Sequence, residues 1–354
     1  EEQTIDFCPF TNIIYGENAQ GKTNILEAIY LTSMGKSHRT QRYNEMIKWG
    51  KDFCRINTKY NKSNNDGDID YLIKKNQKKQ IKVNSIKLNK LNEILGVINI
   101  VMFSPEHMKI IKDGPSERRK FIDSILSQTK PRYFYNLSQY LKVVEQRNIL
   151  LSKSNEKKEI EKTLHIWDSQ LTDFGSKIIK DRNDFIKSIR NNVNKVNSEL
   201  SKGKETLEIL YKPSVNFKED NLCEIKNAFE KRLQKSKEAD IKRGVTSYGP
   251  HRDEIVFLIN GKDLRSFGSQ GQQRSGLLSL KIAEMKFIKE ETNIMPVLLL
   301  DDVFSELDIK RQNYLLYYIK NMQVILTCTN YEGIEFSNIN DCSYFKVKNG
   351  YINI

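Results

Sequence analysis

Apolar positions along this chain follow two different periods, and the change between them divides the sequence. From residue 109 to residue 243 apolar side chains recur at steps of three and four, as at Trp167, Leu171 and Phe174. That spacing is typical of amphipathic helices that bury one face. We therefore predict a stretch of several helices in the middle of the chain.

Short strand-like runs lie on both sides of this helical stretch. Residues 52–100 alternate between apolar and polar positions, with turn residues at 64–67 and at 76–77, which predicts a meander of strands. Residues 255–261 predict a strand followed by a tight Asn-Gly turn. Residues 324–326 predict a last buried strand.

A glycine-rich turn joins the first apolar strand to a helix. Residues 13–15 predict the strand and residues 23–31 the helix, and between them the chain has the pattern G-x-x-x-x-G-K-T. In that context the pattern is typical of a loop whose backbone N–H groups bind phosphate at a helix N-terminus. The alternative is a turn that precedes Lys-Thr by chance. The expected nucleotide-binding residues are Gly16, Glu17, Asn18, Ala19, Gln20, Gly21, Lys22, Thr23 and Asn24.

Individual roles follow from the chemistry of these side chains. Lys22 is expected to reach the β- and γ-phosphates and so to act in catalysis, and the Thr23 hydroxyl is expected to ligate Mg²⁺. Far downstream, residues 296–300 predict a buried parallel strand, and ligands gather at the carboxyl ends of such strands. Asp301 is therefore a second candidate Mg²⁺ ligand, and Asp302 a candidate base that orients the attacking water.

The acidic pair alone could be a loop start or a helix cap. Two further motifs accompany it, one before a helical run at 275–288 and one directly after the pair. The first resembles the signature of ABC-type ATPases, which contacts the nucleotide held by a second subunit, although a simple helix cap is the alternative. The second has the spacing of their D-loop. The signature candidates are Ser269, Gln270, Gly271, Gln272, Gln273 and Arg274, and the D-loop candidates are Ser305, Glu306, Leu307 and Asp308.

The order of these motifs predicts an α/β fold. We expect an ABC-type P-loop ATPase head made of residues 1–108 and 244–354, with a helical arm, residues 109–243, inserted into it. The chain begins at Glu1 without a methionine, and we expect a few residues to precede it, including a strand that could help to pack the adenine.

Composition narrows the class of protein. The 354 residues are 38% hydrophobic, and no apolar run is long enough to cross a bilayer. Five scattered cysteines indicate reduced thiols, no structural metal and a cytoplasmic location. The net charge of +13 suits a polyanionic partner, but the abundance of Lys, Asn and Ile, which AT-rich coding produces, weakens that argument.

Basic residues gather in three places: after the phosphate-loop helix, near the turn at 76–77, and at 118–120. Phosphate contacts need cations but no base readout, so binding through them would be independent of sequence and sensitive to salt. Each cluster could equally be a solvated face, and residues 118 and 119 could instead stabilise the junction of head and arm. The candidate DNA contacts are Lys36, His38, Arg39, Arg42, Lys74, Lys75 and Lys78.

Taken together, the motifs resemble those of the RecF family of DNA-repair ATPases, which are relatives of the SMC and Rad50 proteins. The resemblance covers nearly the whole chain and rests on the phosphate loop, the signature and the runs 103–106, 114–123, 249–254 and 300–308. It implies a homodimer that forms with ATP and Mg²⁺ on double-stranded DNA near single-strand gaps. It also implies the loading of recombinase together with RecR and RecO.

Two departures from the wider ABC pattern bear on the rate of hydrolysis. Asp302 stands where these ATPases usually have the longer glutamate, and residues 327–329 contain no histidine where a transporter ATPase has one. Both indicate slow hydrolysis, which suits a switch. With the family resemblance, we expect a weak ATPase that DNA stimulates. The alternatives are the ATPase subunit of a membrane transporter, which the missing histidine disfavours, and an SMC-like tether, for which the insertion is short.

Overall fold

The computed structural model describes residues 2–40, 42–90, 93–152, 157–332 and 341–353. It divides into two compact units, one of residues 1–107 and 284–354 and the other of residues 108–283.

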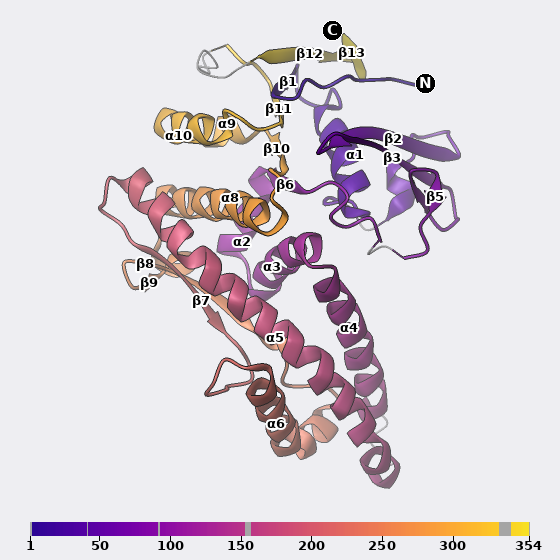
Figure 1. Cartoon of the computed structure of the whole chain (residues 1–354), viewed down its shortest axis with the longest axis vertical. Coiled ribbons are helices and arrows are strands. Elements are labelled where there is room, and N and C mark those ends of the chain that lie inside the picture. The colour runs from indigo at the N-terminus through magenta and orange to yellow at the C-terminus, as the bar shows by residue number, and fades with distance from the viewer. Residues whose placement is uncertain (1, 41, 91–92, 153–156, 333–340, 354) are drawn as a thin grey trace. The chain divides into compact units, whose positions relative to one another are not determined.

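A six-stranded sheet forms the centre of the first unit, with the strand order β13-β12-β1-β11-β10-β6 (Figure 1). All neighbouring strands are parallel except β13, which is antiparallel to β12. Parallel strands that are covered on both faces need continuous apolar runs, and β10 and β11 are aliphatic and buried along most of their length. The strands are β1 (Thr11–Tyr15), β6 (Ile100–Phe103), β10 (Val297–Asp301), β11 (Val324–Cys328), β12 (Cys342–Lys348) and β13 (Tyr351–Asn353).

Helices of the first unit follow the strands that carry the candidate motifs. Helix α1 (Lys22–Met34) follows β1, and α9 (Val303–Glu306) and α10 (Ile309–Ile319) follow β10. One-turn 3₁₀ helices lie at Tyr43–Met46 and Pro105–Met108. The predicted strand at 13–15 and helix at 23–31 are confirmed, as are the strands near 297 and 324.

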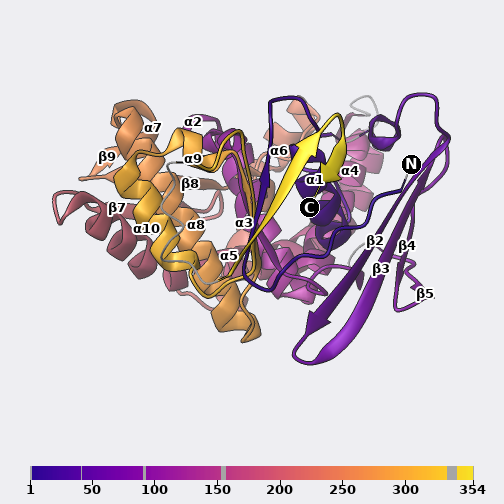
Figure 2. The ribbon, with the colours of Figure 1, turned by 90° about the horizontal axis from the view of Figure 1, so that it is seen from above.

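A second, antiparallel sheet of the first unit has the order β2-β3-β4-β5, and its first two strands form the long ribbon in Figure 2. The strands are β2 (Phe53–Lys62), β3 (Asn65–Lys74), β4 (Gln80–Val83) and β5 (Ile86–Lys87). The predicted meander is confirmed, but its first turn was placed wrongly. Ser63 and Asn64 form that turn, with φ of 52° and 63°. Two successive positive φ angles are typical of a two-residue hairpin turn, because they match the twist of the strands on either side.

Helices dominate the second unit, but it also contains a small sheet. The helices are α2 (Lys109–Lys112), α3 (Pro115–Thr129), α4 (Pro131–Ser152), α5 (Lys157–Ser201), α6 (Leu222–Arg243), a 3₁₀ turn (Pro250–Arg252), α7 (Leu264–Phe267) and the first part of α8 (Gln270–Thr292). The unit boundary falls inside α8. The apolar stripe from Trp167 to Leu200 lies on the single 45-residue helix α5, on the order of 65 Å long.

Strand β7 (Leu207–Lys212) was missed by the sequence analysis, which predicted only helices between 109 and 243. It pairs antiparallel with β8 (Glu254–Ile259), which in turn pairs with β9 (Lys262–Asp263). Through this pairing, residues after 243 belong to the same compact unit as the helices that precede them in the chain. The compact units therefore separate at 283/284, whereas the sequence placed the second boundary at 243/244. The assignment of the units to a head and an arm stays a prediction.

Buried arginines hold the helices of the second unit together. Arg182 on α5 donates to Asp123 on α3 at 2.8 Å, to Asp253 at 3.3 Å and to the carbonyl of Pro250 at 2.6 Å. Because the guanidinium and Asp253 are buried, loss of Arg182 would leave that carboxylate without this positive partner in a medium of low dielectric constant. This network fixes α3 and α5 against the turn that leads into β8.

Helices α4, α5 and α6 pack closely together at Gly175 on α5. A Cβ there would lie 2.5 Å from the ring of Phe229 on α6 and 3.1 Å from the ring of Tyr140 on α4. We expect Gly175→Ala to lower the free energy of unfolding by about 1–2 kcal/mol, because overpacking outweighs the gain of about 1 kcal/mol in helix propensity. Urea denaturation measures the change.

Gly114→Ala is the control, because a Cβ at Gly114 meets no atom within 4 Å. It should change stability by less than about 0.5 kcal/mol. A stabilised Gly175→Ala protein would contradict the packing described for α4, α5 and α6.

Candidate nucleotide-binding site

The backbone of the loop between β1 and α1 takes conformations that only some residues allow. Gly16, Ala19 and Gly21 have φ of 151°, 64° and 101°. A Cβ at Gly16 would lie 2.3 Å from the carbonyl oxygen of Val347 on β12, so that position requires glycine. The loop thus turns sharply into the first turn of α1, where free N–H groups and the helix dipole favour an anion.

Lys22 lies inside this loop. Its Nζ donates to the carbonyl of Gly16 at 2.6 Å and to that of Glu17 at 2.8 Å, and the side chain is only 8% exposed. The two carbonyls hold the ammonium group against the loop backbone. It can therefore meet a phosphate that the same backbone binds.

Thr23 and Asp301 come together from positions 278 residues apart. The Thr23 hydroxyl donates to Oδ1 of Asp301 at 3.0 Å. The sheet order explains this meeting, since β11 lies between β1 and β10 and all three strands end at the same edge.

This pair has the right chemistry for Mg²⁺. The ion prefers oxygen ligands and usually takes one or two from protein and the rest from phosphates and water. Among the residues that the structure describes, no group of three or more His, Cys, Asp or Glu side chains could hold a metal ion. Thr23 and Asp301 supply two oxygens of the kind that Mg²⁺ prefers.

Asp302 has a left-handed backbone, with φ of 51° and ψ of 30°. Such a conformation is uncommon outside glycine and often marks a functional position. Its N–H lies 3.1 Å from the hydroxyl and 3.2 Å from the carbonyl oxygen of Thr327. Asp302 thus directly follows Asp301, the candidate metal ligand, and its backbone is fixed by hydrogen bonds from the neighbouring strand.

Thr327 on β11 was not singled out as a site residue by the sequence analysis, although it belongs to the site. It is buried, and its hydroxyl donates to Oδ1 of Asp301 at 2.7 Å. Its successor, Cys328, has a pKa raised to about 11 because it is buried, so the thiol stays neutral. Register could have revealed Thr327, because it pairs directly with Asp301 across the ladder.

The signature candidates at 269–274 lie in the second unit, at the start of α8. Ser269 and Gln272 form a reciprocal cap: the Ser269 hydroxyl accepts from the Gln272 N–H at 3.2 Å, and the Gln272 side chain accepts from the Ser269 N–H at 2.9 Å. Gln272 also donates to Glu205 at 3.0 Å. Ser269 and Gln270 are exposed at the N-terminus of a 23-residue helix. Both interpretations of the sequence, cap and anion site, remain compatible with this geometry.

The D-loop candidates at 305–308 follow the acidic pair through the short helix α9. The serine hydroxyl of this segment donates to the carbonyl of Asp302 at 2.7 Å. Gln312 on α10 donates to the carbonyls of Phe304 at 2.7 Å and Leu307 at 3.0 Å, a clamp that the sequence did not indicate. The segment is therefore held next to Asp302 and remains exposed at three of its four residues.

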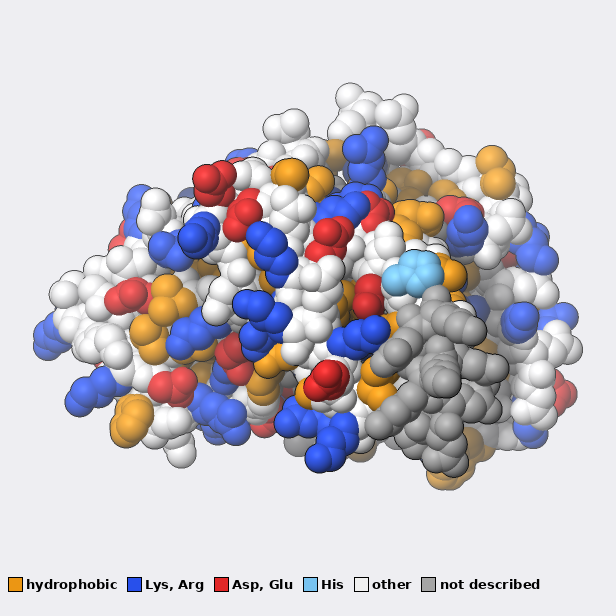
Figure 3. Space-filling view, turned by 90° about the horizontal axis from the view of Figure 1, so that it is seen from below, with side chains coloured by type: hydrophobic (Ala, Val, Ile, Leu, Met, Phe, Trp, Pro, Cys, Tyr) orange, Lys and Arg blue, Asp and Glu red, His pale blue; other side chains and the backbone are white. Residues whose placement is uncertain are grey.

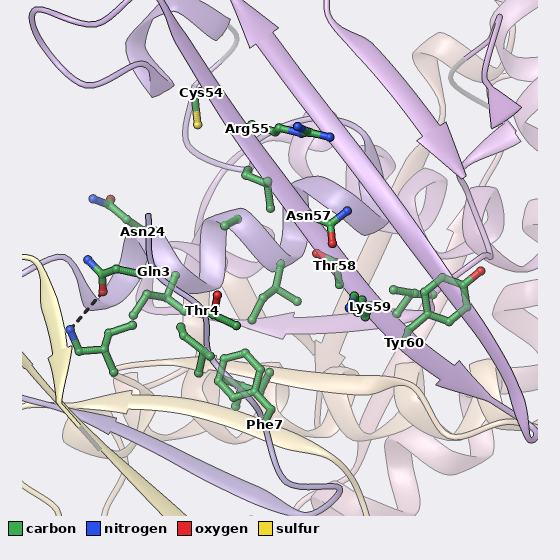
Figure 4. Close-up of a pocket in the computed structure, with 18 of the residues that line it drawn as sticks. Gln3, Thr4, Phe7, Asn24, Cys54, Arg55, Asn57, Thr58, Lys59 and Tyr60 are labelled. Carbon is green, nitrogen blue, oxygen red and sulfur yellow. Dashed lines mark hydrogen bonds between the residues drawn. The ribbon is translucent and has the colours of Figure 1, made fainter. Parts of the chain in front are cut away.

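A large hollow of the first unit lies between β2 and the N-terminal segment (Figure 4). Gln3 ties that segment to β13, by bonds to the carbonyl of Gly350 at 2.7 Å and to the N–H of Ile352 at 3.1 Å. The hollow measures about 2430 Å³, larger than a fitted ligand pocket, and reaches the phosphate loop at Gly21 and Asn24. A nucleotide base would thus have room beside the start of α1.

Arg39, a candidate DNA contact, is tied to α1. It forms an ion pair with Glu27 at 3.1 Å and donates to Asn24 at 3.0 Å. Asn24 lies in the first turn of the helix that follows the phosphate loop. Through its hydrogen bond to Asn24, Arg39 is therefore connected to the candidate nucleotide site as well as exposed at the surface.

The other candidates of this loop differ in exposure. Lys36 is exposed, and so is Arg42, which lies 3.7 Å from Glu45. His38 packs edge-on against Tyr30. Burial lowers the pKa of His38 below its usual value, so we expect a neutral imidazole, a weaker partner for phosphate than an ammonium group.

In the second basic cluster, the candidate lysines are held least by other side chains. Lys74, Lys75 and Lys78 are exposed at the end of β3 and in the turn after it, and none has a side-chain partner in the described part of the chain. Lys79, by contrast, donates to the Tyr43 hydroxyl at 2.6 Å and is held in the fold. Figure 3 shows a face on which basic and acidic side chains are interspersed, so the net positive charge is not gathered there into one patch.

The third basic cluster is largely structural. Arg118 is buried in the second unit, where it pairs with Glu254 at 2.9 Å and donates to backbone carbonyls. Arg119 donates to the carbonyl of Asp253 at 2.7 Å. Only Lys120 is exposed, and it pairs with Glu117. Of the two alternatives for Arg118, its burial and its pair with Glu254 favour the structural role.

Among the described residues no helix is both long enough and apolar enough to cross a bilayer.

Comparison with known proteins identifies relatives along the whole chain. The family model described as the RecF/RecN/SMC N terminal domain matches residues 1–351. The DNA replication and repair protein RecF of Lachnoclostridium phytofermentans is 46% identical over 352 residues, which cover 99% of this chain and 95% of that protein. The protein of the same name from Clostridium tetani is 43% identical over 350 residues, with the same coverage.

Solved structures give the same result. A structure of the recombination mediator protein RecF with ATP, from the RecFOR pathway, matches with a TM-score of 0.92 and 40% identity, over all of this chain and 93% of that one. An Smc head bound to the winged-helix domain of ScpA matches with a TM-score of 0.56 at 17% identity, over 99% of this chain and 90% of that one. The second likeness shows the fold alone. The chain therefore belongs to the RecF/RecN/SMC N-terminal domain family, and within that family to the RecF proteins.

Proposed function

We propose that this protein is an ATP-dependent DNA-binding switch of recombinational repair. The observation that carries the proposal is the contact between Thr23, at the phosphate loop, and Asp301, at the end of β10. It joins a phosphate-binding backbone to a metal carboxylate in one site, which is what nucleotide hydrolysis needs.

The first unit would bind ATP with Mg²⁺. The loop from Gly16 to Asn24 would hold the phosphates, with Lys22 on the β- and γ-phosphates. Thr23 and Asp301 would hold the ion, which neutralises charge that develops on the phosphate oxygens. Asp302 would orient the attacking water. A solved relative that is 40% identical is described as RecF with ATP, which supports this assignment.

Dimerisation would complete the site. Ser269 and Gln270 are exposed at the N-terminus of a long helix, where a γ-phosphate from a second copy could be bound by backbone N–H groups and a hydroxyl. The segment 305–308, held beside Asp302, would lie at the same interface. ATP would then favour the dimer, because each copy supplies ligands to the nucleotide of the other.

Hydrolysis would be slow and would release the dimer from DNA. Asp302 is one methylene shorter than the glutamate usual in these ATPases and therefore reaches less far toward a water. Lys74, Lys75 and Lys78, with Lys36 and Arg42, would contact the phosphates of double-stranded DNA near single-strand gaps. RecR, with RecO, would be the protein partners, because a solved relative belongs to the RecFOR pathway. A cytoplasmic location fits such a role.

Nothing favours a second candidate function. The relatives are RecF proteins at 43–46% identity over nearly the whole chain, which leaves no support for a transporter subunit. The likeness to the Smc head concerns the fold alone and does not support a tether.

Lys22→Met tests the phosphate loop. We expect the affinity for ATP to fall by roughly 10- to 150-fold, the value of about 1.5–3 kcal/mol for a charge-assisted hydrogen bond. Equilibrium binding of a fluorescent ATP analogue measures the change. Lys231→Met, at an exposed lysine on α6 in the second unit, should bind as the natural protein does. Unchanged affinity in Lys22→Met would refute the nucleotide site.

Asp302→Asn tests the base. We expect the rate of ATP hydrolysis to fall by about 100-fold or more, since the amide cannot accept the proton of the water. Affinity for ATP should change little. Release of phosphate under single-turnover conditions gives the rate. Normal turnover would remove Asp302 from this role.

A triple variant, Lys74→Glu with Lys75→Glu and Lys78→Glu, tests the DNA contacts. The affinity for duplex DNA should fall, and the slope of its logarithm against the logarithm of salt concentration should decrease in magnitude by up to about 3, because each phosphate contact contributes about 0.9. Fluorescence anisotropy at several salt concentrations measures both.

The matched control changes three exposed lysines on α6, Lys231, Lys235 and Lys242, to Glu. It alters net charge equally but lies in the second unit. If both triple variants lose affinity to the same extent, the cluster at 74–78 is not a specific DNA contact.

A further inference from the structure

The hydroxyl of Thr327 makes two contacts at once within the candidate site. It donates to Oδ1 of Asp301 at 2.7 Å and accepts from the N–H of Asp302 at 3.1 Å. Thr327 is 1% exposed, so these contacts do not compete with bulk water. The single hydroxyl therefore links the metal carboxylate to the backbone of the candidate base.

The parallel ladder places Thr327 for this task. Asp301 on β10 and Thr327 on β11 are register partners, so their side chains leave the sheet on the same face. Asp302 is the next residue, and its left-handed backbone, with φ of 51°, turns its N–H back toward β11. The same N–H also lies 3.2 Å from the carbonyl of Thr327. The strand thus holds Asp302 even where the hydroxyl is absent.

Two threonine hydroxyl groups donate to the same oxygen of Asp301. Thr23 and Thr327 both donate to Oδ1, at 3.0 Å and 2.7 Å. Among the residues that the structure describes, none donates a hydrogen bond to Oδ2. The carboxylate is therefore fixed by one oxygen, and the other is left to face a ligand.

We propose that Thr327 is a positioning residue for Mg²⁺, which orients the Asp301 carboxylate through its hydroxyl and so sets the affinity of the site for the ion. The inference rests on the proposed ATPase function and goes one step further. Thr327 would act on the ion through Asp301, to which its hydroxyl donates. Groups that hydrogen-bond to a metal ligand typically change metal affinity by 10- to 100-fold when they are removed.

Thr327→Val tests the proposal, because valine keeps the shape and the β-branched stem but lacks the hydroxyl. We expect the Mg²⁺ concentration for half-maximal binding of a fluorescent ATP analogue to rise by about tenfold. Binding of the same analogue in EDTA should stay within about twofold, since the phosphate loop is unchanged. Thr327→Ser should restore the Mg²⁺ midpoint to within about twofold of the natural value.

Thr11→Val is the matched control. Thr11 is a fully buried threonine on the neighbouring strand β1, and its hydroxyl has no hydrogen-bond partner in the described part of the chain. Its replacement should leave the Mg²⁺ midpoint unchanged. Thermal unfolding of each variant without nucleotide reports any general loss of stability, and Thr327→Ala takes the place of Thr327→Val if valine prevents folding.

The outcomes separate the inference from the function on which it rests. An unchanged Mg²⁺ midpoint in folded Thr327→Val or Thr327→Ala overturns the inference, and so does a Thr327→Ser protein as impaired as Thr327→Val. Equal losses with and without Mg²⁺ also overturn it, because they indicate a structural role. If the natural protein shows no Mg²⁺-dependent nucleotide binding, the proposed function itself fails, and the inference with it.

Discussion

The alignment of three parallel strand ends is the constraint on which the rest of the site depends. β1 carries the phosphate loop, β10 the acidic pair and β11 the threonine that fixes the pair, and β11 lies between the other two. Since parallel strands end at a common edge, residues from opposite ends of the chain meet there without a long loop to bring them. The hydrogen bonds from Thr23 and Thr327 to Asp301 are the local result of that order.

The two kinds of polar interaction in this protein serve different purposes. In the second unit the buried guanidinium of Arg182 is satisfied by two carboxylates and a carbonyl, an arrangement that keeps helices in register. In the first unit Lys22 is held only by two backbone carbonyls of its own loop, and Oδ2 of Asp301 has no donor in the described part of the chain. Groups that are only partly satisfied by the protein are those that a ligand can complete.

Local motifs could be predicted from the sequence wherever a short pattern determines a local shape. The phosphate loop, the helix after it and the tight turn at Asn260 and Gly261 follow from glycine placement and apolar periodicity, and the structure has them where they were expected. Contacts that depend on strand order could be predicted only where both partners belong to a motif, as Thr23 and Asp301 do. β7 was hidden within a helical stretch because its role as a strand comes from pairing with β8, more than 40 residues away.

The positions of Thr327 and Arg118 likewise depend on tertiary structure, which a local sequence pattern does not determine. The sequence marks residues 327–329 only as the place where a transporter ATPase has a histidine, and the register of β10 against β11 is what places Thr327 beside Asp301. Arg118 looks like part of a surface cluster, but tertiary packing buries it beside Glu254.

The central claim is that two copies of this chain enclose ATP and Mg²⁺ between them. Sedimentation of the natural protein, with and without saturating Mg²⁺-ATP and with duplex DNA present or absent, tests it most directly. We expect Mg²⁺-ATP to bring the protein to a dimer, whatever its state without nucleotide. A protein that remains a single copy with Mg²⁺-ATP, whether or not duplex is present, would contradict it.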